Sequence, residues 1–399
     1  MSEVVTNKME NINSTKSISR PRLILEPIAL LTVLGLMFGY LGGNMGVANM
    51  FNTLFNTAHQ LLLNTILFLM GITVLAGAAG RLLMEFHVIG MIERLLVPLM
   101  RPVFNLPGRA AMAAMMTFFS DNPAIIGLAK DRRFNRSFKT HEIISLTNFG
   151  TAFGMGLIVI TFMSTLGGNK EGATYIVPAF IGLAGATVGA IVSTRLMQWL
   201  IRDEVALQRI ESEDHAADKV LKACHDGDPI WLRFLNSVLD GGKGGVEMGL
   251  AIIPGVLIIS TLVMTLTFGP SSDGYTGAAF EGVALLPYLA GFLSPVFELL
   301  FGFHSPELVA FPITSLGAVG AAMSLVPNFI EQGLIGGSEV AVFTAMGMCW
   351  SGYLSTHTAM LDSLGFRQLT SKAIIAHTVG GIAAGVAARY LYLLSQSVF

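Results

Sequence analysis

The sequence predicts an all-α polytopic membrane protein, built from two inverted repeats and one extra N-terminal helix. Of the 399 residues, 53% are hydrophobic and only 13% are charged, and the mean hydropathy is +0.65. A soluble domain usually carries about a quarter charged residues. Several apolar runs reach the roughly 20 residues that a spanning helix needs. An internal repeat in the order of segments predicts the two halves.

Seven apolar runs are the expected spanning helices. Five of them contain no Lys, Arg, Asp or Glu: Leu61–Gly80, Ile143–Leu166, Ala173–Thr194, Met248–Leu266 and Val340–Leu361. Leu23–Leu41, which holds Glu26, and Ala373–Ala388 are weaker. None of the runs alternates with a period of two, as the strands of an outer-membrane barrel would.

The basic residues predict orientation, because Lys and Arg favour the cytoplasmic side of short loops. With the N-terminus inside, the cluster from Lys130 to Lys139 and the segment from Arg195 to Lys243 face the cytoplasm. If Leu285–Leu300 lies on the membrane surface, every basic residue except Lys170 and Arg389 is cytoplasmic, and the C-terminus is outside. We therefore expect a multi-pass protein of the inner (cell) membrane with a cytoplasmic N-terminus.

Three sets of residues recur at a spacing of about 195, which indicates an internal repeat. The matched sets are Pro102-Val103-Phe104 with Pro295-Val296-Phe297, Glu142-Ile143 with Glu339-Val340, and Gly185/Gly189 with Gly381/Gly385. Each half then holds a span, a surface helix (Phe86–Leu99 or Phe280–Leu300), a broken segment and two further spans. Because three crossings per half is an odd number, the second half must be inverted.

A re-entrant hairpin is predicted in each half. In the first, Ser120-Asp121-Asn122-Pro123 separates two short apolar helices, and Asp or Asn before Pro is a helix-start signal. In the second, Thr314-Ser315-Leu316-Gly317 separates Glu307–Ile313 from Ala318–Phe329. Corresponding broken helices in two halves indicate the substrate site of a secondary transporter.

These features divide the chain into five segments. They are a cytoplasmic tail (1–22), an extra N-terminal transmembrane helix and loop (23–60), a first repeat (61–200) with its hairpin at 109–130, a cytoplasmic connector (201–245), and a second repeat (246–399) with its hairpin at 305–330.

The segments Phe118–Ala124 and Asn148–Phe153, with their second-half counterparts, resemble those of the nucleoside-recognition or gate-domain membrane proteins. The layout resembles the inverted-repeat architecture of concentrative nucleoside transporters. The resemblance implies a membrane-embedded transporter and a homo-oligomer. Where those transporters typically carry a Gln-Thr-Glu-like hairpin tip, this chain has Ser-Asp-Asn-Pro.

The candidate substrate- or ion-binding residues are the polar groups of the two tips and of the helices that follow them. They are Ser120, Asp121, Asn122, Asn148, Thr151, Thr314, Ser315, Thr344, Ser351 and Thr356. An ionisable side chain inside a membrane is costly and indicates function, so Asp121 is the leading candidate. The alternative is structural: Asp, Asn and Ser cap helix N-termini, and Ser or Thr in a helix bonds to the preceding turn.

We expect a secondary active transporter of a small polar solute, with nucleosides as one candidate class, coupled to Na⁺ or H⁺. Its expected partners are the lipid bilayer and the solute; a net charge of −2 gives no reason to expect a nucleic acid. No enzyme motif occurs in a fitting context, and no cofactor is expected. Two alternatives stay open: a non-transporting scaffold of the spore-maturation kind, and a divalent-metal permease using Cys349, Met346, Met348 and His357.

Overall fold

The computed structural model describes residues 20–120, 122, 125, 134, 137–166, 174–202 and 229–398. Within these residues six helices are long and apolar enough to cross a membrane. They are Leu25–Met45, Val47–Glu85, Thr140–Thr165, Ile176–Leu200, Ile230–Thr267 and Arg367–Ser397. A bent pair, Ser294–Phe301 with Pro306–Gly317, passes the same test together, with an angle of 72° between its parts. The chain is therefore an all-α, multi-pass membrane protein.

The first half of the chain contains α2 (Arg20–Met45), α3 (Val47–Gln60), η1 (Leu61–Ile66), α4 (Leu67–Glu85), α5 (Val88–Leu99), η2 (Met100–Phe104), α6 (Ala110–Phe119), α9 (Thr140–Thr151), α10 (Gly156–Thr165) and α11 (Ile176–Leu200). The second half contains α13 (Ile230–Gly255), η3 (Val256–Ser260), α14 (Thr261–Thr267), α15 (Leu285–Gly291), α16 (Ser294–Phe301), η4 (Pro306–Val309), α17 (Ala310–Gly317), α18 (Val319–Met323), α19 (Val326–Glu331), α20 (Gly337–Cys349), α21 (Tyr353–Ser363), η5 (Arg367–Leu369) and α22 (Thr370–Val398).

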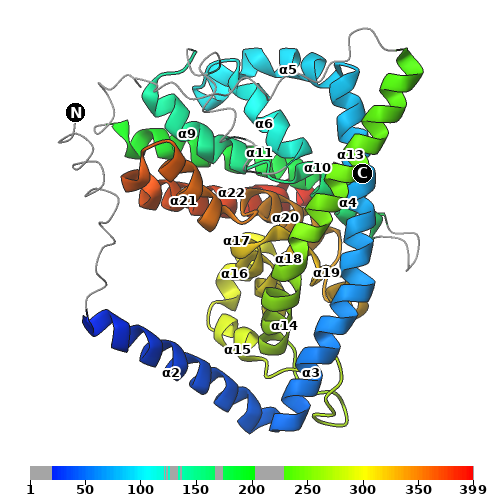
Figure 1. The fold of residues 1–399 in the computed structure, drawn as a ribbon, viewed down its shortest axis with the longest axis vertical. Helices are drawn as coiled ribbons and strands as arrows, with labels where there is room; N and C mark the ends of the chain where they lie inside the picture. The colour runs from blue at the N-terminus through cyan, green and yellow to red at the C-terminus, as the bar shows by residue number, and fades with distance from the viewer. Residues whose placement is uncertain are drawn as a thin grey trace, which may run out of the picture.

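Two long helices pack side by side at one edge of the molecule, α4 with its extension α3, and α13 with η3 and α14 (Figure 1). They approach closely because small residues meet at the contact: a Cβ added to Gly245 would lie 2.3 Å from the carbonyl oxygen of Thr73. The Thr73 hydroxyl donates a hydrogen bond of 2.8 Å to the carbonyl of Gly245. At one end of the pair, the Arg233 guanidinium donates to the Glu85 carboxylate at 2.7 Å, and the Glu85 side chain is 5% exposed.

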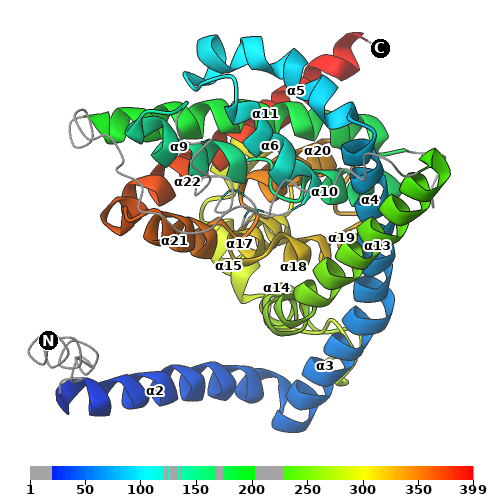
Figure 2. The same ribbon diagram turned by 45° about the horizontal axis from the view of Figure 1, so that its top comes forward.

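A second group of helices fills the interior, where α11, α20 and α22 pack against one another (Figure 2). The α11–α22 contact again depends on glycine. A Cβ on Gly185 would lie 2.7 Å from the carbonyl oxygen of Ala384, and one on Gly189 would lie 2.7 Å from that of Gly380. Small residues spaced four apart let two helix backbones approach closely. The α11–α22 pair lies at the centre of the molecule, and α2 extends away from it.

The same order of elements occurs in both halves. Among the described residues, a long helix with a π-helical turn is followed by shorter helices, a helix divided by an irregular turn, and a long final helix. Two glutamates mark the correspondence: Glu142 accepts a hydrogen bond from the backbone N–H of Lys139 at 2.7 Å, and Glu339 accepts one from that of Gly336 at 2.8 Å. Each carboxylate therefore caps the start of its helix, α9 or α20.

Two segments expected to be loops are helical. The segment 47–60 is α3, and the end of the expected connector, from Ile230, is the start of α13. The polar residues of α3 form a stripe that bonds to the 275–281 loop: Asn49 and Asn56 donate to the carbonyls of Tyr275 and Gly277, both at 2.8 Å. Hydrogen bonds to a loop that is distant in sequence thus satisfy polar side chains of α3, a segment that was expected to be a loop.

One carboxylate of that loop, Glu281, is 3% exposed. Its oxygens accept hydrogen bonds from the backbone N–H groups of Thr276 and Gly277 and from the Thr276 hydroxyl at 2.6 Å. Burial acts to raise the pKa of Glu281, but the hydrogen bonds to its charged form outweigh burial and lower the pKa below its ordinary value. These bonds hold the loop in shape around the carboxylate, and the Thr53 hydroxyl of α3 donates to the same carboxylate at 3.5 Å.

Candidate functional site

Two of the apolar segments are interrupted at matching positions. The first interruption separates α9 from α10 at residues 152–155, and the second separates α20 from α21 at residues 350–352. Each ends with a left-handed residue, Met155 (φ 53°) or Gly352 (φ 64°). Val340–Leu361 was expected to be one spanning run, and Gly352 divides it.

Each interruption is hydrogen-bonded to the first helix of a broken segment. The backbone N–H of Met155 donates to the carbonyl of Thr117 on α6 at 3.2 Å, and the N–H of Gly352 donates to the carbonyl of Ser315 on α17 at 3.0 Å. These are equivalent contacts in the two halves. They place each irregular turn beside one of the two predicted tips.

The two halves meet at this point. The side-chain amide of Asn122 donates to the carbonyl of Ser351 at 2.7 Å, with Asn122 1% exposed. Gly154 lies between them: an added Cβ there would be 2.4 Å from Asn122 Oδ1 and 2.9 Å from Ser351 Cβ. Both irregular turns and the first predicted tip therefore meet in one buried contact, and the second broken segment bonds to the next residue, Gly352.

A cavity of about 220 Å³ opens beside this contact, and we call it the junction cavity. It is lined by Met155, by Met248, Ala251, Ile252 and Gly255 of α13, by Gly317, Ala318, Val319 and Gly320, and by Ser351, Gly352, Ser355 and Thr356. Pockets for drug-sized ligands typically exceed about 300 Å³, so this cavity suits a small solute.

Three hydroxyls give the junction cavity its polar character. Thr356 and Ser355 donate to the carbonyl of Gly352, at 2.8 and 3.2 Å, which leaves the lone pairs of both hydroxyl oxygens available as acceptors. The Ser351 hydroxyl makes no hydrogen bond within the part of the chain that the structure describes, so it can donate or accept. The first turn of α21 adds backbone N–H groups that have no partner inside the helix.

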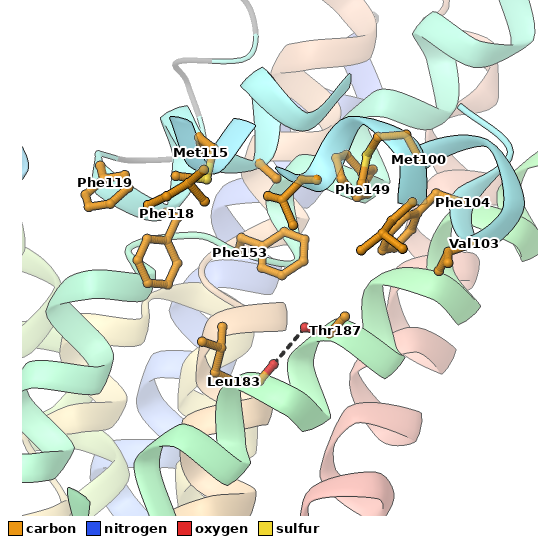
Figure 3. Close-up of a pocket in the computed structure, with 14 residues that line it drawn as sticks. Met100, Val103, Phe104, Met115, Phe118, Phe119, Phe149, Phe153, Leu183 and Thr187 are labelled. Atoms are coloured by element: carbon orange, nitrogen blue, oxygen red, sulfur yellow. Dashed lines mark hydrogen bonds between the residues drawn. The ribbon is translucent and has the colours of Figure 1, made fainter. Parts of the chain in front are cut away.

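A larger cavity of about 410 Å³ lies between α5, η2, α6, α9 and α11 (Figure 3). Phenylalanine, methionine and aliphatic side chains line it, including Phe118, Phe149 and Phe153. Its hydroxyl, Thr187, donates to the carbonyl of Leu183 at 3.0 Å, as the dashed line in Figure 3 shows. A polar solute would find almost no hydrogen-bonding group here, so this cavity is the weaker candidate despite its size.

The predicted site residues other than Asn148 fall into three groups. Ser351 and Thr356 line the junction cavity, and Asn122 and Ser315 touch its edge through the contacts above. Thr151, Thr314 and Thr344 are buried and donate to carbonyls one turn earlier in their own helices: Thr147, Ala310 and Val340. Ser120 is exposed at the end of α6, and Asp121 lies outside the described residues.

Asn148 belongs to a different polar cluster. Its amide donates to the Ser193 hydroxyl at 3.1 Å and to the carbonyl of Ala373 at 3.0 Å. Ser193 in turn contacts His377 Nδ1 at 2.9 Å. Sequence reasoning missed His377, because a single histidine in an apolar run shows no sign of the partners that α9 and α11 bring to it.

The tip of the second broken segment differs from the expected one. Helix α17 continues through Thr314 and Ser315 to Gly317, and Ala318 is extended (φ −163°, ψ 120°) before α18 begins. The break therefore falls about three residues later than the Thr-Ser pair suggested. The tip therefore runs from Gly317 to Gly320, and these four residues line the junction cavity.

The residues proposed as soft-metal ligands gain no support from the described part of the chain. No group of three His, Cys, Asp or Glu side chains within metal-binding reach occurs among the described residues. The Cys349 thiol points towards the carbonyls of Ala152 and Ala186, each at 3.7 Å, whereas its own carbonyl faces His377.

Comparisons with known proteins support the fold. No family model and no curated protein matches the chain. A solved structure does match: a doubly substituted CNTnw, a concentrative nucleoside transporter, in an outward-facing state. The TM-score is 0.50 at 12% identity, and the match covers 94% of this chain and 88% of that one. The chain resembles a nucleoside transporter in fold. The resemblance to gate-domain proteins stays a prediction.

Proposed function

We propose that the protein is a secondary active transporter that binds a small polar solute in the junction cavity. The observation that carries this proposal is the meeting of both irregular turns and the first tip at Asn122, Gly154 and Ser351, with Ser315 of the second broken segment bonded to the next residue, Gly352. Irregular backbone inside a membrane is tolerated where it lines a cavity or is buried in protein. Broken helices at a repeat interface are the usual site of solute binding in such transporters.

The position of the cavity supports alternating access. One wall comes from α13, which packs with α4, and the other walls come from the tip of α17–α18 and the turn before α21. Movement of one group against the other would open the cavity to one side and close it to the other. We propose that the two halves are inverted repeats, that residues 109–130 and 305–330 are re-entrant hairpins, and that Na⁺ or H⁺ drives the movement.

Nucleosides are the first solute class to test, since the fold neighbour is a nucleoside transporter. A ribose and base offer hydroxyls, carbonyls and N–H groups that Ser351, Ser355 and Thr356 can bond. The volume of about 220 Å³ suits a molecule of that size or smaller. Organic acids and nucleobases are the comparison classes.

The test is a thermal-unfolding screen of the purified protein against nucleosides, nucleobases, organic acids and divalent metals, with and without Na⁺. A solute that binds only the folded state raises the unfolding midpoint. Thr356→Val removes a cavity hydroxyl with little change of shape and should weaken binding about tenfold. The matched control is Thr358→Val, an exposed residue of the same helix whose hydroxyl bonds to the carbonyl of Leu354.

Asp121→Asn tests the leading sequence candidate in the same screen. A shift with one solute class that Thr356→Val reduces and Thr358→Val preserves supports the proposal. If no solute shifts the midpoint, the protein does not bind a solute as proposed, and the scaffold alternative gains support. A shift with metals alone would favour permeation of a divalent cation.

A further inference from the structure

Two histidines, His357 of α21 and His377 of α22, are fully buried and lie against each other. Their ring centroids are 4.6 Å apart, and neither side chain is exposed. His357 directly follows Thr356, which lines the junction cavity. The solute site proposed above makes no use of either ring, so this pair requires its own explanation.

Hydrogen bonds define the protonation of His377. Its Nε2 lies 2.5 Å from the carbonyl of Cys349, and because a carbonyl only accepts, Nε2 carries the hydrogen. Its Nδ1 then accepts from the Ser193 hydroxyl, whose oxygen receives a hydrogen bond from Asn148. The neutral ring of His377 is therefore satisfied at both nitrogens.

His357 differs at one nitrogen. Its Nδ1 lies 3.0 Å from the carbonyl of Tyr353, so Nδ1 carries the hydrogen and Nε2 bears a lone pair. That Nε2 is buried, and among the described residues it has no hydrogen-bond partner. A buried polar atom left without a partner costs about 1–3 kcal/mol, so a native protein rarely keeps one without a use for it.

The surroundings of His357 contain few other titratable groups. His377 of α22 is the one titratable side chain of another element in contact with its ring, and Tyr353 of its own helix stacks edge-on at 5.7 Å. Helix α17 has no titratable residue, and His141 of α9 lies beside Glu142. Other described charged side chains on these elements lie elsewhere: Glu142 bonds to Arg101, Asp362 to Arg367 and Lys372 to the carbonyl of Leu200, and the Arg389 guanidinium lies beside Gly302.

We propose that His357 Nε2 binds the coupling proton of the transporter and that this structure is its proton-free state. The proposal rests on the transport function above and names H⁺ as the coupling ion. A proton added to Nε2 would create a buried cation against the ring of His377, with an N–H that has no acceptor among the described residues. Such a state is unfavourable unless the surroundings rearrange.

The rearrangement would reach the solute site through His377. This residue holds the second irregular turn twice: its Nε2–H bonds to the carbonyl of Cys349, and its own carbonyl accepts the Trp350 indole N–H at 3.3 Å. Ser351 and Gly352, which directly follow Trp350 in the sequence, line the junction cavity. A protonated His357 needs an acceptor or water for its new N–H, and any movement of the adjacent His377 ring that provides one acts on the turn that forms the cavity wall.

Trp350 provides a direct test. In a protein carrying Trp199→Phe and Trp231→Phe, Trp350 is the remaining tryptophan, and its emission reports the turn. Titration from about pH 8 down to about pH 4 should show one single-proton transition, with a tenfold change in the ratio of the two forms for each pH unit. His357→Gln should abolish the transition, and the exposed control His59→Gln should retain it.

A titration that is absent in the parent, or unchanged in His357→Gln, overturns the proposal. Nitrogen NMR of imidazole-labelled parent protein decides the matter if His357→Gln does not fold. The expected spectrum shows one neutral ring protonated at Nδ1 that becomes doubly protonated in acid. If the rings of both His357 and His377 stay neutral over the whole pH range, the proposal is contradicted without any variant.

Uptake of labelled uridine into proteoliposomes under a pH gradient separates this proposal from the transport function. We expect the gradient to stimulate uptake by the parent, and we expect His357→Gln to lose that stimulation by about tenfold or more. Equal stimulation in His357→Gln would overturn the proton site and leave transport intact. If neither protein takes up uridine, nucleoside transport fails, while the Trp350 titration still decides whether His357 binds a proton.

Discussion

Replacing Gly154 by alanine should damage the contact on which the proposed site depends. The new Cβ would lie 2.4 Å from Asn122 Oδ1 and 2.9 Å from Ser351 Cβ, whereas ordinary contacts between heavy atoms need about 3.5 Å or more. Asn122 would have to move by about 1 Å, which breaks its 2.7 Å bond to the Ser351 carbonyl. Overpacking costs about 1–3 kcal/mol and the lost hydrogen bond about 1 kcal/mol.

The expected loss for Gly154→Ala is therefore about 2–4 kcal/mol in the free energy of unfolding, measured as a fall of several degrees in the unfolding midpoint. The matched control is Gly71→Ala in α4, where an added Cβ meets nothing within 4 Å. That control should be neutral or stabilising by up to about 1 kcal/mol, because alanine is the better helix former. If Gly154→Ala is as stable as Gly71→Ala, the close approach of the two halves at this point is wrong.

Three further predictions concern other parts of the structure. Arg233→Ala should lower the unfolding free energy by about 3 kcal/mol, because it leaves the buried Glu85 carboxylate without this cation; full recovery by Arg233→Lys would refute the role of the planar guanidinium. Gly352→Ala should cost about 1–2 kcal/mol in a thermal scan, since φ at this position is +64°; no loss would show that the left-handed turn is not required. The folded-state pKa of Glu281 lies below its ordinary 4.5, so its stabilising effect is complete above about pH 4.5 and disappears as the pH falls through the folded-state pKa. Glu281→Gln should flatten this acid dependence of the unfolding midpoint, whereas the exposed control Asp273→Asn should not.

The membrane class could be predicted from sequence, because apolar runs of about 20 residues have a direct physical meaning in a bilayer. Six such helices are present among the described residues. The small-residue pair Gly185/Gly189 was also a useful signal, since it lies where α11 crosses α22. These features depend on local composition, which a single sequence contains.

The details of the site could not be predicted in the same way. Met155 takes a left-handed conformation that nothing in its own side chain favours, and only the packing of α6 against α9 and α10 requires it. The Thr314-Ser315 pair suggested a tip, but both hydroxyls donate to their own helix, which continues to Gly317. Polar residues in a membrane helix have two uses, and the sequence does not distinguish internal hydrogen bonding from solute binding.

The contact between His357 and His377 illustrates the same limit. The two residues are 20 positions apart on different helices, and each alone fits a helix end or a satisfied core position. Only the pairing of α21 with α22 brings the rings together, and only the carbonyls of Tyr353 and Cys349 determine which nitrogen carries a hydrogen. Such a cluster is a property of the tertiary structure.

Thiol labelling of the junction cavity tests solute binding there most directly. In a protein with Cys224→Ser and Cys349→Ala, Ser355→Cys places a thiol in the cavity wall, and Thr358→Cys places one on the exposed face of the same helix. A stabilising solute from the screen, with uridine tried first, should slow maleimide labelling of Ser355→Cys by about tenfold or more near saturation and leave Thr358→Cys unchanged. Equal labelling of Ser355→Cys with and without a solute that demonstrably binds would show that the solute occupies another site, and would contradict the proposed transport pathway.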